Sequence, residues 1–316
     1  ITFANGVHPK GCKQRTAGQP IGRGPDPKAV YVPLSQHIGK PALPVVEAGD
    51  RVRCGQLIGR ADKELSANVY SPVSGTVKGV VGHITLSGKK ADHILIENDF
   101  LDEKTFLPPL AERTRESVLA RIAEAGIVGM GGAAFPTAAK LGTDKKIDIL
   151  LVNGAECEPY ITCDERIMLE YTDQLSEGIR LCMLACGADR AVIGIENNKK
   201  AAAAKLARVS GTGISVRVLK TKYPQGAEKQ LVYSCTKRVI PENCLPADIG
   251  VLVVNVHTAL AVYRAVEENT PCYERVMTVS GKRVDRPSNI WVKNGTPYRD
   301  IAELCGAHED CERIVS

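Results

Sequence analysis

The spacing of hydrophobic and polar residues changes twice along the chain. Before about residue 100, short apolar runs such as residues 45–52 and 71–78 are separated by Gly, Asp and Pro. This spacing predicts short β-strands joined by tight turns. Beyond residue 114, helix-periodic stretches alternate with nearly continuous apolar runs, and after about residue 270 the β-like spacing returns. The pattern therefore indicates three regions of different architecture.

The middle region predicts alternating helices and strands. Its apolar runs predict strands at 147–152, 190–195, 214–219 and 249–256. Its periodic stretches predict helices at 115–125, 165–186, 199–209, 227–235 and 258–266. Apolar strands that alternate with helices are typical of a parallel sheet covered on both faces. We therefore expect an α/β core with a Rossmann-like parallel sheet.

The two outer regions resemble known β modules. In the first, G-D-x-V-x-x-G-Q-x-I followed by S-P-V-S-G-T-V resembles a biotinyl/lipoyl-type barrel-sandwich hybrid domain. Lys63 lies near the lysine that lipoyl domains modify, but Glu64 follows it and the gap to Ser71 is longer, so we expect a structural domain. The last region, with strands at 275–280 and 290–292 and a helix near 297–305, resembles a soluble-ligand-binding β-grasp segment. The expected domains are 1–113 including a linker, 114–270 and 271–316.

Charge and hydropathy narrow the class of protein. The net charge of +5 comes from Lys and Arg interspersed with Asp and Glu, so we expect no nucleic-acid partner. No run of 18 apolar residues occurs, and we expect the chain to span no membrane by itself. Residues 1–6 lack a basic, apolar leader, so exposure to the cytosol is the simplest expectation.

The cysteines give no sign of a metal or cluster site. There are 11, with no C-x-x-C spacing, so neither a zinc knuckle nor an iron–sulfur cluster is expected within these residues. Cys182 and Cys186, at i and i+4 on a predicted helix, are expected to be buried as small apolar residues. The expected metal content of this chain is none.

The strongest motif is the glycine-rich loop GMGGAAFPT at residues 129–137. Glycines allow positive φ and a close approach of the backbone to a ligand, and exposed amides can bind a phosphate. The loop follows a predicted helix, whereas the Rossmann fingerprint follows a strand and opens a helix. We therefore reject an ordinary Rossmann loop; a packing turn is the alternative on spacing alone.

Further motifs carry a family resemblance. The loop with Lys140 after it resembles the flavin loop shared by the NADH-binding subunit of respiratory complex I and the C subunit of Rnf electron-transport complexes. NGAECEPY at 153–160, TKYPQGAEKQ at 221–230 and NVHT at 255–258 resemble that family's later blocks, in the same order. PLSQHIG at 33–39 and the barrel-sandwich region are typical of the Rnf protein. The resemblance covers essentially the whole chain.

The resemblance implies non-covalent FMN and NAD(H) as cofactors. The residues expected to bind them are Gly129, Gly131, Gly132, Ala133, Phe135, Lys140, Asn153, Glu156, Glu158, Tyr223, Gly226, Glu228, Asn255 and Thr258. The loop amides and Lys140 would hold the FMN phosphate side, and Thr258 would add a hydroxyl or amide. Asn153 and Asn255 would contact the ribityl chain or ring edge. No residue is assigned as catalytic, since the flavin carries the hydride chemistry.

The remaining expected roles concern NAD(H). Glu156, Glu158 and Glu228 would line the nucleotide side, where carboxylates favour ribose hydroxyls and disfavour a 2′-phosphate. Phe135 would offer an aromatic face to adenine. Tyr223 and Gly226 would border the flavin. Met130 and Ala134 depart from the complex I pattern, and His257 is expected to be structural.

The resemblance implies a peripheral subunit of an ion-translocating ferredoxin:NAD+ oxidoreductase. It would pass electrons between NAD(H) and FMN, and onward to 4Fe-4S clusters in a C-terminal part beyond these residues. Its partners would be other Rnf subunits and, indirectly, ferredoxin-linked carriers, at the cytoplasmic face of a bacterial membrane. Two alternatives stay open: a cobalamin-reductase-like flavoprotein, and a non-catalytic scaffold that has lost flavin.

Overall fold

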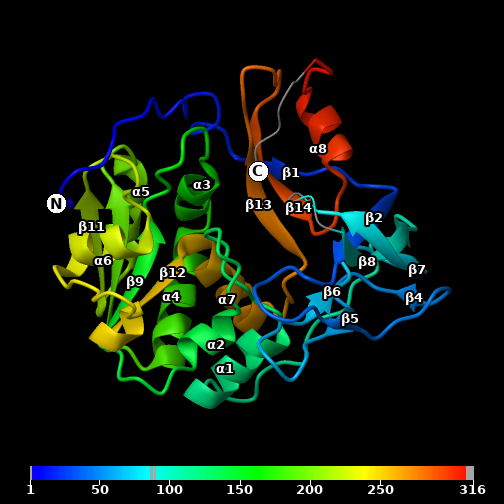
Figure 1. Ribbon diagram of the computed structural model, residues 1–316, viewed down its shortest axis with the longest axis horizontal. Helices are drawn as coiled ribbons and strands as arrows, with labels where there is room; N and C mark the ends of the chain where they lie inside the picture. The colour runs from blue at the N-terminus through cyan, green and yellow to red at the C-terminus, as the bar shows by residue number, and fades with distance from the viewer. Residues whose placement is uncertain (1, 86–87, 89, 311–316) are drawn as a thin grey trace.

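Four parallel strands form the central sheet of one lobe. In this computed structural model, which describes residues 2–85, 88 and 90–310, the strand order is β11-β10-β9-β12 (Figure 1). The strands are β9 (Ile149–Gly154), β10 (Arg190–Glu196), β11 (Ile214–Leu219) and β12 (Val251–Asn255). All three pairings are parallel. The predicted parallel sheet is confirmed.

Helices cover both faces of this sheet, as its apolar strands require. In β9, Leu150 and Val152 belong to one core, and Ile149 and Leu151 belong to the other. Helices α1, α4, α5 and α7 contribute to the first core, and α6 contributes to the second. The helices of the lobe are α1 (Arg115–Glu124), α2 (Thr137–Leu141), α3 (Cys163–Glu170), α4 (Thr172–Cys186), α5 (Lys200–Val209), α6 (Glu228–Thr236), the 3₁₀ turn η1 (Pro246–Ile249) and α7 (Val256–Glu267).

The single helix predicted over 165–186 is wrong. The chain forms α3 and α4, which meet at Tyr171 with φ −114° and ψ 37°. The hydroxyl of Thr172 donates to the carbonyl of Met168 at 2.7 Å. Tyr171 in turn accepts a hydrogen bond from Trp291 Nε1 at 3.0 Å. A distant contact and a local side-chain bond therefore bend the chain where its apolar periodicity continues.

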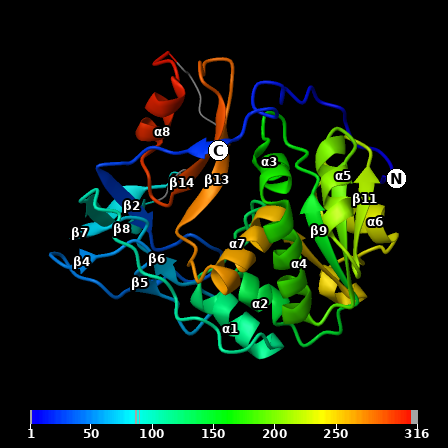
Figure 2. The ribbon, with the colours of Figure 1, turned by 180° about the vertical axis from the view of Figure 1, so that it is seen from behind.

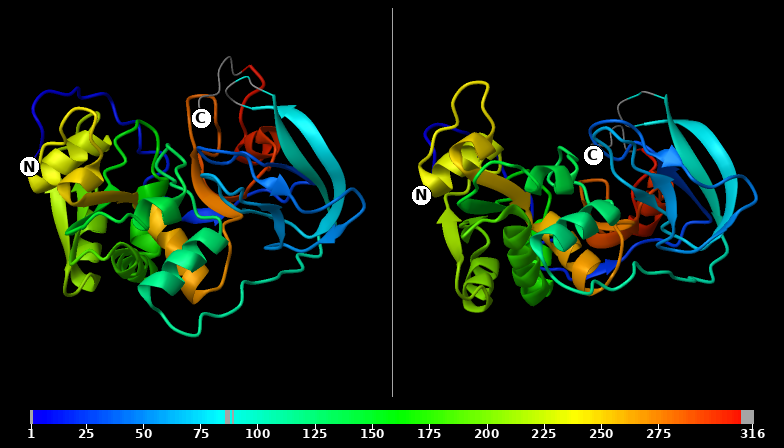
Figure 3. Two further views of the ribbon diagram at one scale, coloured as in Figure 1. Left: turned by 60° about the horizontal axis from the view of Figure 1, so that its bottom comes forward. Right: turned by 90° about the horizontal axis from the view of Figure 1, so that it is seen from below.

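The second lobe contains the barrel-sandwich region. One sheet has the order β2-β8-β7-β4 and the other the order β3-β5-β6, and the side chains between them form a separate apolar core. Figure 3 shows the long β7–β8 hairpin at the outer side of this lobe. The strands are β2 (Ala29–Pro33), β3 (Leu43–Pro44), β4 (Arg51–Val52), β5 (Leu57–Arg60), β6 (Val69–Tyr70), β7 (Gly75–Ile84) and β8 (Lys90–Asn98).

A third sheet joins the beginning of the chain to its last part. β1 (Ile21–Arg23) pairs in parallel with β14 (Ser288–Lys293), which pairs antiparallel with β13 (Glu274–Val279), and α8 (Tyr298–Cys305) follows. Ile290, Ile301 and neighbouring apolar side chains form its core. The segment is a sheet with a helix, and its assignment to the β-grasp class stays a prediction. Cys311 and the rest of residues 311–316 lie outside the described residues.

Residues 2–20 lie along the α/β lobe before they reach β1 (Figures 1 and 2). The backbones of Val7 and Tyr223 pair there, and Tyr160 N donates to Gly11 O at 2.8 Å. These residues therefore belong to the 1–113 region in sequence but pack on the 114–270 region in space. The boundaries at 113 and 270 remain predictions. Among the described residues, no helix is both long and apolar enough to span a membrane.

Candidate functional site

Two asparagines mark the carboxyl edge of the parallel sheet. Asn153 is the last residue but one of β9, and it pairs in register with Asn255, the last residue of β12. After β9 the chain forms β10 and β11 on one side of β9, and it then forms β12 on the other side. The topological switch point therefore lies between β9 and β12. Open α/β sheets bind ligands outside the carboxyl ends of their strands at such points. The two asparagines therefore lie where a ligand is expected.

Each asparagine also orients a loop at this edge. Asn153 Nδ2 donates to the carbonyl of Gly226 at 2.9 Å, and its Oδ1 accepts from Ala155 N. Asn255 Oδ1 accepts from His257 N at the start of α7, and its Nδ2 donates to Asp164 Oδ2 at 2.7 Å. Because an amide nitrogen has two hydrogens, each side chain keeps a donor for a ligand.

The glycine loop lies against the end of β12. Met130 N donates to the hydroxyl of Thr258 at 3.0 Å, and Gly129 N donates to Phe135 O at 2.9 Å. A Cβ at Gly131 would lie only 3.3 Å from Asn255 Cβ. Thr258 is buried, so its hydroxyl serves to anchor the loop.

The tip of the loop fits an anionic or flavin ligand. Gly131, Gly132 and Ala133 are exposed, and their amides donate to no other described residue. Gly132 has φ +114°, and a Cβ added there would meet nothing within 4 Å. Such free, outward amides form the kind of nest that holds a phosphate. Ala134 also has a left-handed backbone conformation, with φ +48°, although it is not a glycine.

Lys140 brings positive charge to the same edge. It lies on α2, and its Nζ is 3.1 Å from Glu228 Oε1 and donates to Val253 O at 2.9 Å. Both side chains are partly exposed. Lys140 and Glu228 therefore come together at this edge as an ion pair that a phosphate would have to share or displace.

Tyr223 and Gly226 lie beside the loop that follows β9. Gly226 N donates to Cys157 Sγ at 3.3 Å, and a Cβ at Gly226 would stand 3.3 Å from that sulfur. Glu158 is exposed, and its carboxylate raises the pKa of the Tyr223 hydroxyl. The structure thus gathers Tyr223, Gly226 and Glu158 next to Asn153.

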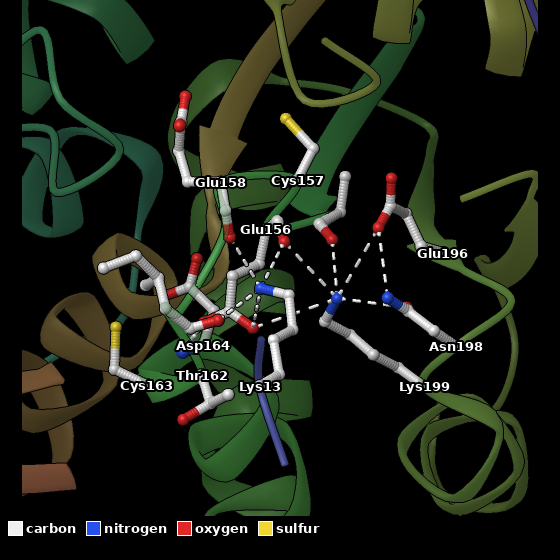
Figure 4. Close-up of polar contacts among 12 residues, drawn as sticks. Lys13, Glu156, Cys157, Glu158, Thr162, Cys163, Asp164, Glu196, Asn198 and Lys199 are labelled. Atoms are coloured by element: carbon white, nitrogen blue, oxygen red, sulfur yellow. Dashed lines mark hydrogen bonds and ion pairs between the residues drawn. The ribbon is translucent and has the colours of Figure 1, made fainter. Parts of the chain in front are cut away.

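Glu156 is turned into the protein instead. Its side chain is 3% exposed, and its Oε1 accepts from Asp164 N at 2.7 Å. Figure 4 shows the ammonium groups of Lys13 and Lys199 converging on it, while Cys157 and Glu158 point the other way. Burial raises the pKa of Glu156 to about 8, and burial also raises that of Asp164 to about 6. Glu156 is therefore part of a buried charge cluster under the site.

Several members of this cluster were not predicted from the sequence. Lys199 is fully buried, and its Nζ donates to Ala155 O at 2.8 Å and lies 3.8 Å from Glu196 Oε2. Glu196 ends β10 at the same sheet edge as Asn153. Asn153 was selected by the family resemblance of its sequence block; a polar residue at the end of an apolar strand is a signal that would have marked Glu196 as well. Lys13 and Asp164 gave no such signal.

His257 has the structural role expected for it. It is buried at the start of α7, and its Nε2 accepts from Val276 N at 3.3 Å. Burial lowers the pKa of this histidine to about 3, so the ring is neutral near pH 7. Its neutral ring packs edge-on against Trp291.

A cavity of about 410 Å³ lies elsewhere, between β1, α7 and β14. Arg264 lines it, stacks on Trp291 and is already paired with Glu274 at 2.7 Å. None of the predicted site residues lines this cavity. The predicted residues converge on the sheet edge, which is therefore the better candidate.

Two family models match this chain. Residues 1–101 match the RnfC barrel sandwich hybrid domain, and residues 122–264 match the Nuo51 FMN-binding domain. The second match contains the glycine loop, both asparagines and the segment around Tyr223. The α/β lobe is therefore similar in sequence to FMN-binding domains.

Curated relatives match over nearly the full chain. The chain is 43% identical, over all of its length, to the C subunit of the proton-translocating ferredoxin:NAD(+) oxidoreductase complex of Clostridium ljungdahlii. It is 39% identical over 96% of its length to the Na(+)-translocating counterpart of Acetobacterium woodii. It is 38% identical over 98% of its length to the C subunit of the ion-translocating oxidoreductase complex of a Haemophilus influenzae strain. It spans 71%, 71% and 48% of these relatives, respectively.

A solved structure shares the fold of part of the chain. A chain in the crystal structure of the NAD+-reducing [NiFe]-hydrogenase in the H2-reduced state superposes with a TM-score of 0.53. The match covers 61% of this chain and 39% of that chain, at 22% sequence identity. At that identity the likeness establishes the fold alone.

Proposed function

Because the chain belongs to the family of C subunits of ion-translocating ferredoxin:NAD+ oxidoreductase (Rnf) complexes, we propose that it binds FMN and NAD(H) and passes electrons between them. The observation that supports this most directly is the pairing of Asn153 with Asn255 at the switch point, beside a loop with free amides. The site would take FMN without a covalent bond. When bound, FMN supplies both the hydride chemistry and the exchange of single electrons.

The residues of the site divide by what they offer. The amides of Gly131, Gly132 and Ala133 would hold the phosphate side of FMN, with Lys140 supplying charge and Gly129 and Thr258 holding the loop. The free donors of Asn153 and Asn255 would orient the ribityl chain or ring edge.

The nucleotide would lie on the outer side of the same edge. Glu158 and Glu228 would face its ribose hydroxyls, and Phe135 its adenine, with Tyr223 and Gly226 at the flavin border. Glu156 is buried under the loop, so it would act on the nucleotide only through the loop's conformation. Exposed carboxylates at this face would disfavour the 2′-phosphate of NADP(H) by charge repulsion.

We also propose the setting in which this chemistry occurs. Electrons would continue to 4Fe-4S clusters held outside these 316 residues. The partners would be the other subunits of the complex, with ferredoxin-linked carriers contacted indirectly. The chain would lie at the cytoplasmic face of a bacterial membrane, attached through those subunits.

An anaerobic titration tests the proposal. FMN is added to the protein and its uptake is followed by flavin fluorescence, and NADH is then added while the visible flavin absorbance is recorded. We expect saturable uptake, followed by bleaching of the flavin band. No uptake of FMN at micromolar concentrations would contradict the proposal and favour a scaffold that has lost flavin.

A pair of variants ties the result to the loop. Gly131→Val places a branched side chain where even a Cβ would lie 3.3 Å from Asn255, so FMN uptake should be lost. Gly18→Val is the matched control, because a Cβ there meets nothing within 4 Å. Normal FMN binding by Gly131→Val would place the flavin elsewhere. A cobalamin-reductase-like activity would appear as flavin-dependent reduction of cob(III)alamin by the same preparation.

A further inference from the structure

Lys13 reaches from the N-terminal segment into the loop between β9 and α3. Its ammonium donates to the carbonyls of Glu156 at 3.0 Å, Glu158 at 2.8 Å and Ile161. It also lies 4.0 Å from Glu156 Oε2, and its side chain is only 13% exposed. An ammonium has three hydrogens, so these three carbonyls satisfy it completely. The loop therefore closes around the ammonium of Lys13, and Lys199 contacts only its first residues, through Ala155 O and Glu156 O (Figure 4).

Two residues of this loop have strained backbone conformations. Glu156 and Tyr160 adopt left-handed conformations, with φ +46° and +68°, although neither is glycine. Such conformations persist only when surrounding contacts hold them in place. Converging carbonyl dipoles also repel one another unless a cation lies between them. Lys13 supplies that cation, and the Tyr160 N to Gly11 O bond holds the far end of the loop to the same segment.

A metal ion is a poorer occupant of this position. Glu156, Cys163 and Asp164 each offer a ligand atom, and these atoms lie within 4.8 Å of one another. However, the ammonium groups of Lys13 and Lys199 lie 4.0 and 3.9 Å from Glu156 Oε2. Two positive charges at this distance repel a third. Glu156 Oε2 has no hydrogen-bond partner in the described part of the chain, and the two ammonium groups already occupy the space beside it.

We propose that Lys13 is a positioning residue: its ammonium serves as a built-in monovalent cation that fixes the 156–161 loop and so places the outward-facing Glu158 for NAD(H). This role rests on the proposed function, since Glu158 is taken to face the nucleotide. It assigns part of the site to a segment outside the matched FMN-binding domain. Nucleotide affinity should therefore depend on Lys13, whereas FMN affinity should depend on the glycine loop.

The proposal predicts chemical rescue. Lys13→Ala removes the ammonium but leaves the three carbonyls, which can then bind a free ammonium or methylammonium ion. In FMN-loaded protein we expect the Kd for NADH to rise roughly tenfold or more, with FMN affinity changed less than about twofold. Ammonium chloride should restore most of the NADH affinity. Tetramethylammonium chloride at equal ionic strength is too large for the site and should not.

Two other variants serve as controls. Lys10→Ala removes one exposed positive charge from the same segment and should leave NADH binding unchanged. Lys13→Met keeps an apolar stem of similar length, so it should lose NADH affinity without being rescued. Wild-type NADH affinity in Lys13→Ala would overturn the positioning role. Equal recovery in both salts, or none in either, would overturn the cation site.

A second measurement needs neither flavin nor NADH. The thermal midpoint of apo Lys13→Ala should rise with ammonium relative to tetramethylammonium, whereas that of Lys13→Met should respond equally to both salts. This readout separates the two proposals. Rescue of stability in a protein that takes up no FMN would leave the cation site standing and the proposed function overturned. Absence of any salt-specific effect on stability would overturn the cation site even if FMN and NADH bind.

Discussion

The buried ionisable groups under the sheet edge include more carboxyl groups than ammonium groups. Three carboxyl groups, those of Glu156, Asp164 and Glu196, share a buried region with the ammonium groups of Lys13 and Lys199. Full ionisation would leave one negative charge uncompensated, and burying such a charge is costly. Burial raises the pKa of both Glu156 and Asp164, so the pair retains a proton near neutral pH.

This retained proton makes stability depend on pH. The pKa of Glu156 rises from 4.5 to about 8 on folding, so between these values the folded state binds more protons than the unfolded state. The contribution of Glu156 to the free energy of unfolding therefore falls as pH rises through that window, whereas buried His257, whose pKa is lowered from 6.5 to about 3, adds a contribution that rises up to about pH 6.5. We therefore expect Glu156→Gln to lose on the order of 2 kcal/mol less stability than the wild type between pH 5 and 8. Urea titrations at several pH values measure it.

The control for this prediction is Glu242→Gln. Glu242 is exposed, and its replacement should leave the pH profile of stability unchanged. A Glu156→Gln profile that parallels the wild type would show that Glu156 ionises in the folded protein much as it does in the unfolded chain. Asp164 or Glu196 would then hold the proton.

Thr258 gives a second prediction at this scale. Its buried hydroxyl is the acceptor for Met130 N in the glycine loop. Thr258→Val keeps the shape but removes the acceptor, which should lower the free energy of unfolding by about 1–3 kcal/mol. FMN affinity should fall as well, because the loop loses its anchor. Thr258→Ser keeps the hydroxyl and should retain FMN affinity; equal loss in both variants would point to packing instead.

At the scale of elements, helices α4 and α7 pack unusually closely. Gly178 of α4 faces the backbone of α7, and a Cβ at this position would lie 2.1 Å from the carbonyl oxygen of Ala259. Helix propensity alone favours alanine over glycine by about 1 kcal/mol. Here the methyl group would force the helices apart, so backbone contact decides the residue.

We therefore expect Gly178→Ala to destabilise the protein by about 1–3 kcal/mol, despite its better helix propensity. The matched variant is Ala204→Gly on the exposed face of α5, which should cost about 1 kcal/mol through propensity alone. Thermal unfolding of both variants measures the two effects. Stabilisation by Gly178→Ala would show that α4 and α7 can separate at little cost.

The observed limits of the helices and strands show how well local sequence patterns predict them. The limits predicted for the strand at 214–219 agree with the structure, because this short run is rich in β-branched residues and directly follows a glycine. The predicted 165–186 helix instead breaks at Tyr171, since that residue is needed by Trp291 of β14. The five-residue α2 was not predicted, because one turn has no measurable periodicity. Local pattern identifies elements, but contacts with distant residues set their ends.

At the scale of the whole molecule, Trp291 lies at the contact between the third sheet and the α/β lobe. It is the only tryptophan, and it lies in the third sheet against Tyr171, His257 and Arg264 of the α/β lobe. Its ring is 5.9 Å from that of Tyr171, centre to centre. Its fluorescence should therefore change when the third sheet separates from the α/β lobe.

We expect the third sheet and the α/β lobe to unfold together. In a urea titration, Trp291 emission and far-UV circular dichroism should change at the same midpoint, as a single cooperative unit requires. Arg264→Leu removes the cation over the indole ring and should lower both midpoints equally. A tryptophan transition at distinctly lower urea would mean that the third sheet detaches first.

The sequence by itself determined the types of most elements, the parallel sheet and the glycine loop. These depend on periodicity and on residues near one another in the chain. Only the tertiary structure decided that residues 2–20 pack on the α/β lobe, that Glu156 turns inward, and that Lys13 fills the loop around it. Such contacts join residues far apart in sequence. Whether a lysine is solvated, or is buried and hydrogen-bonded, depends on which surfaces folding brings together.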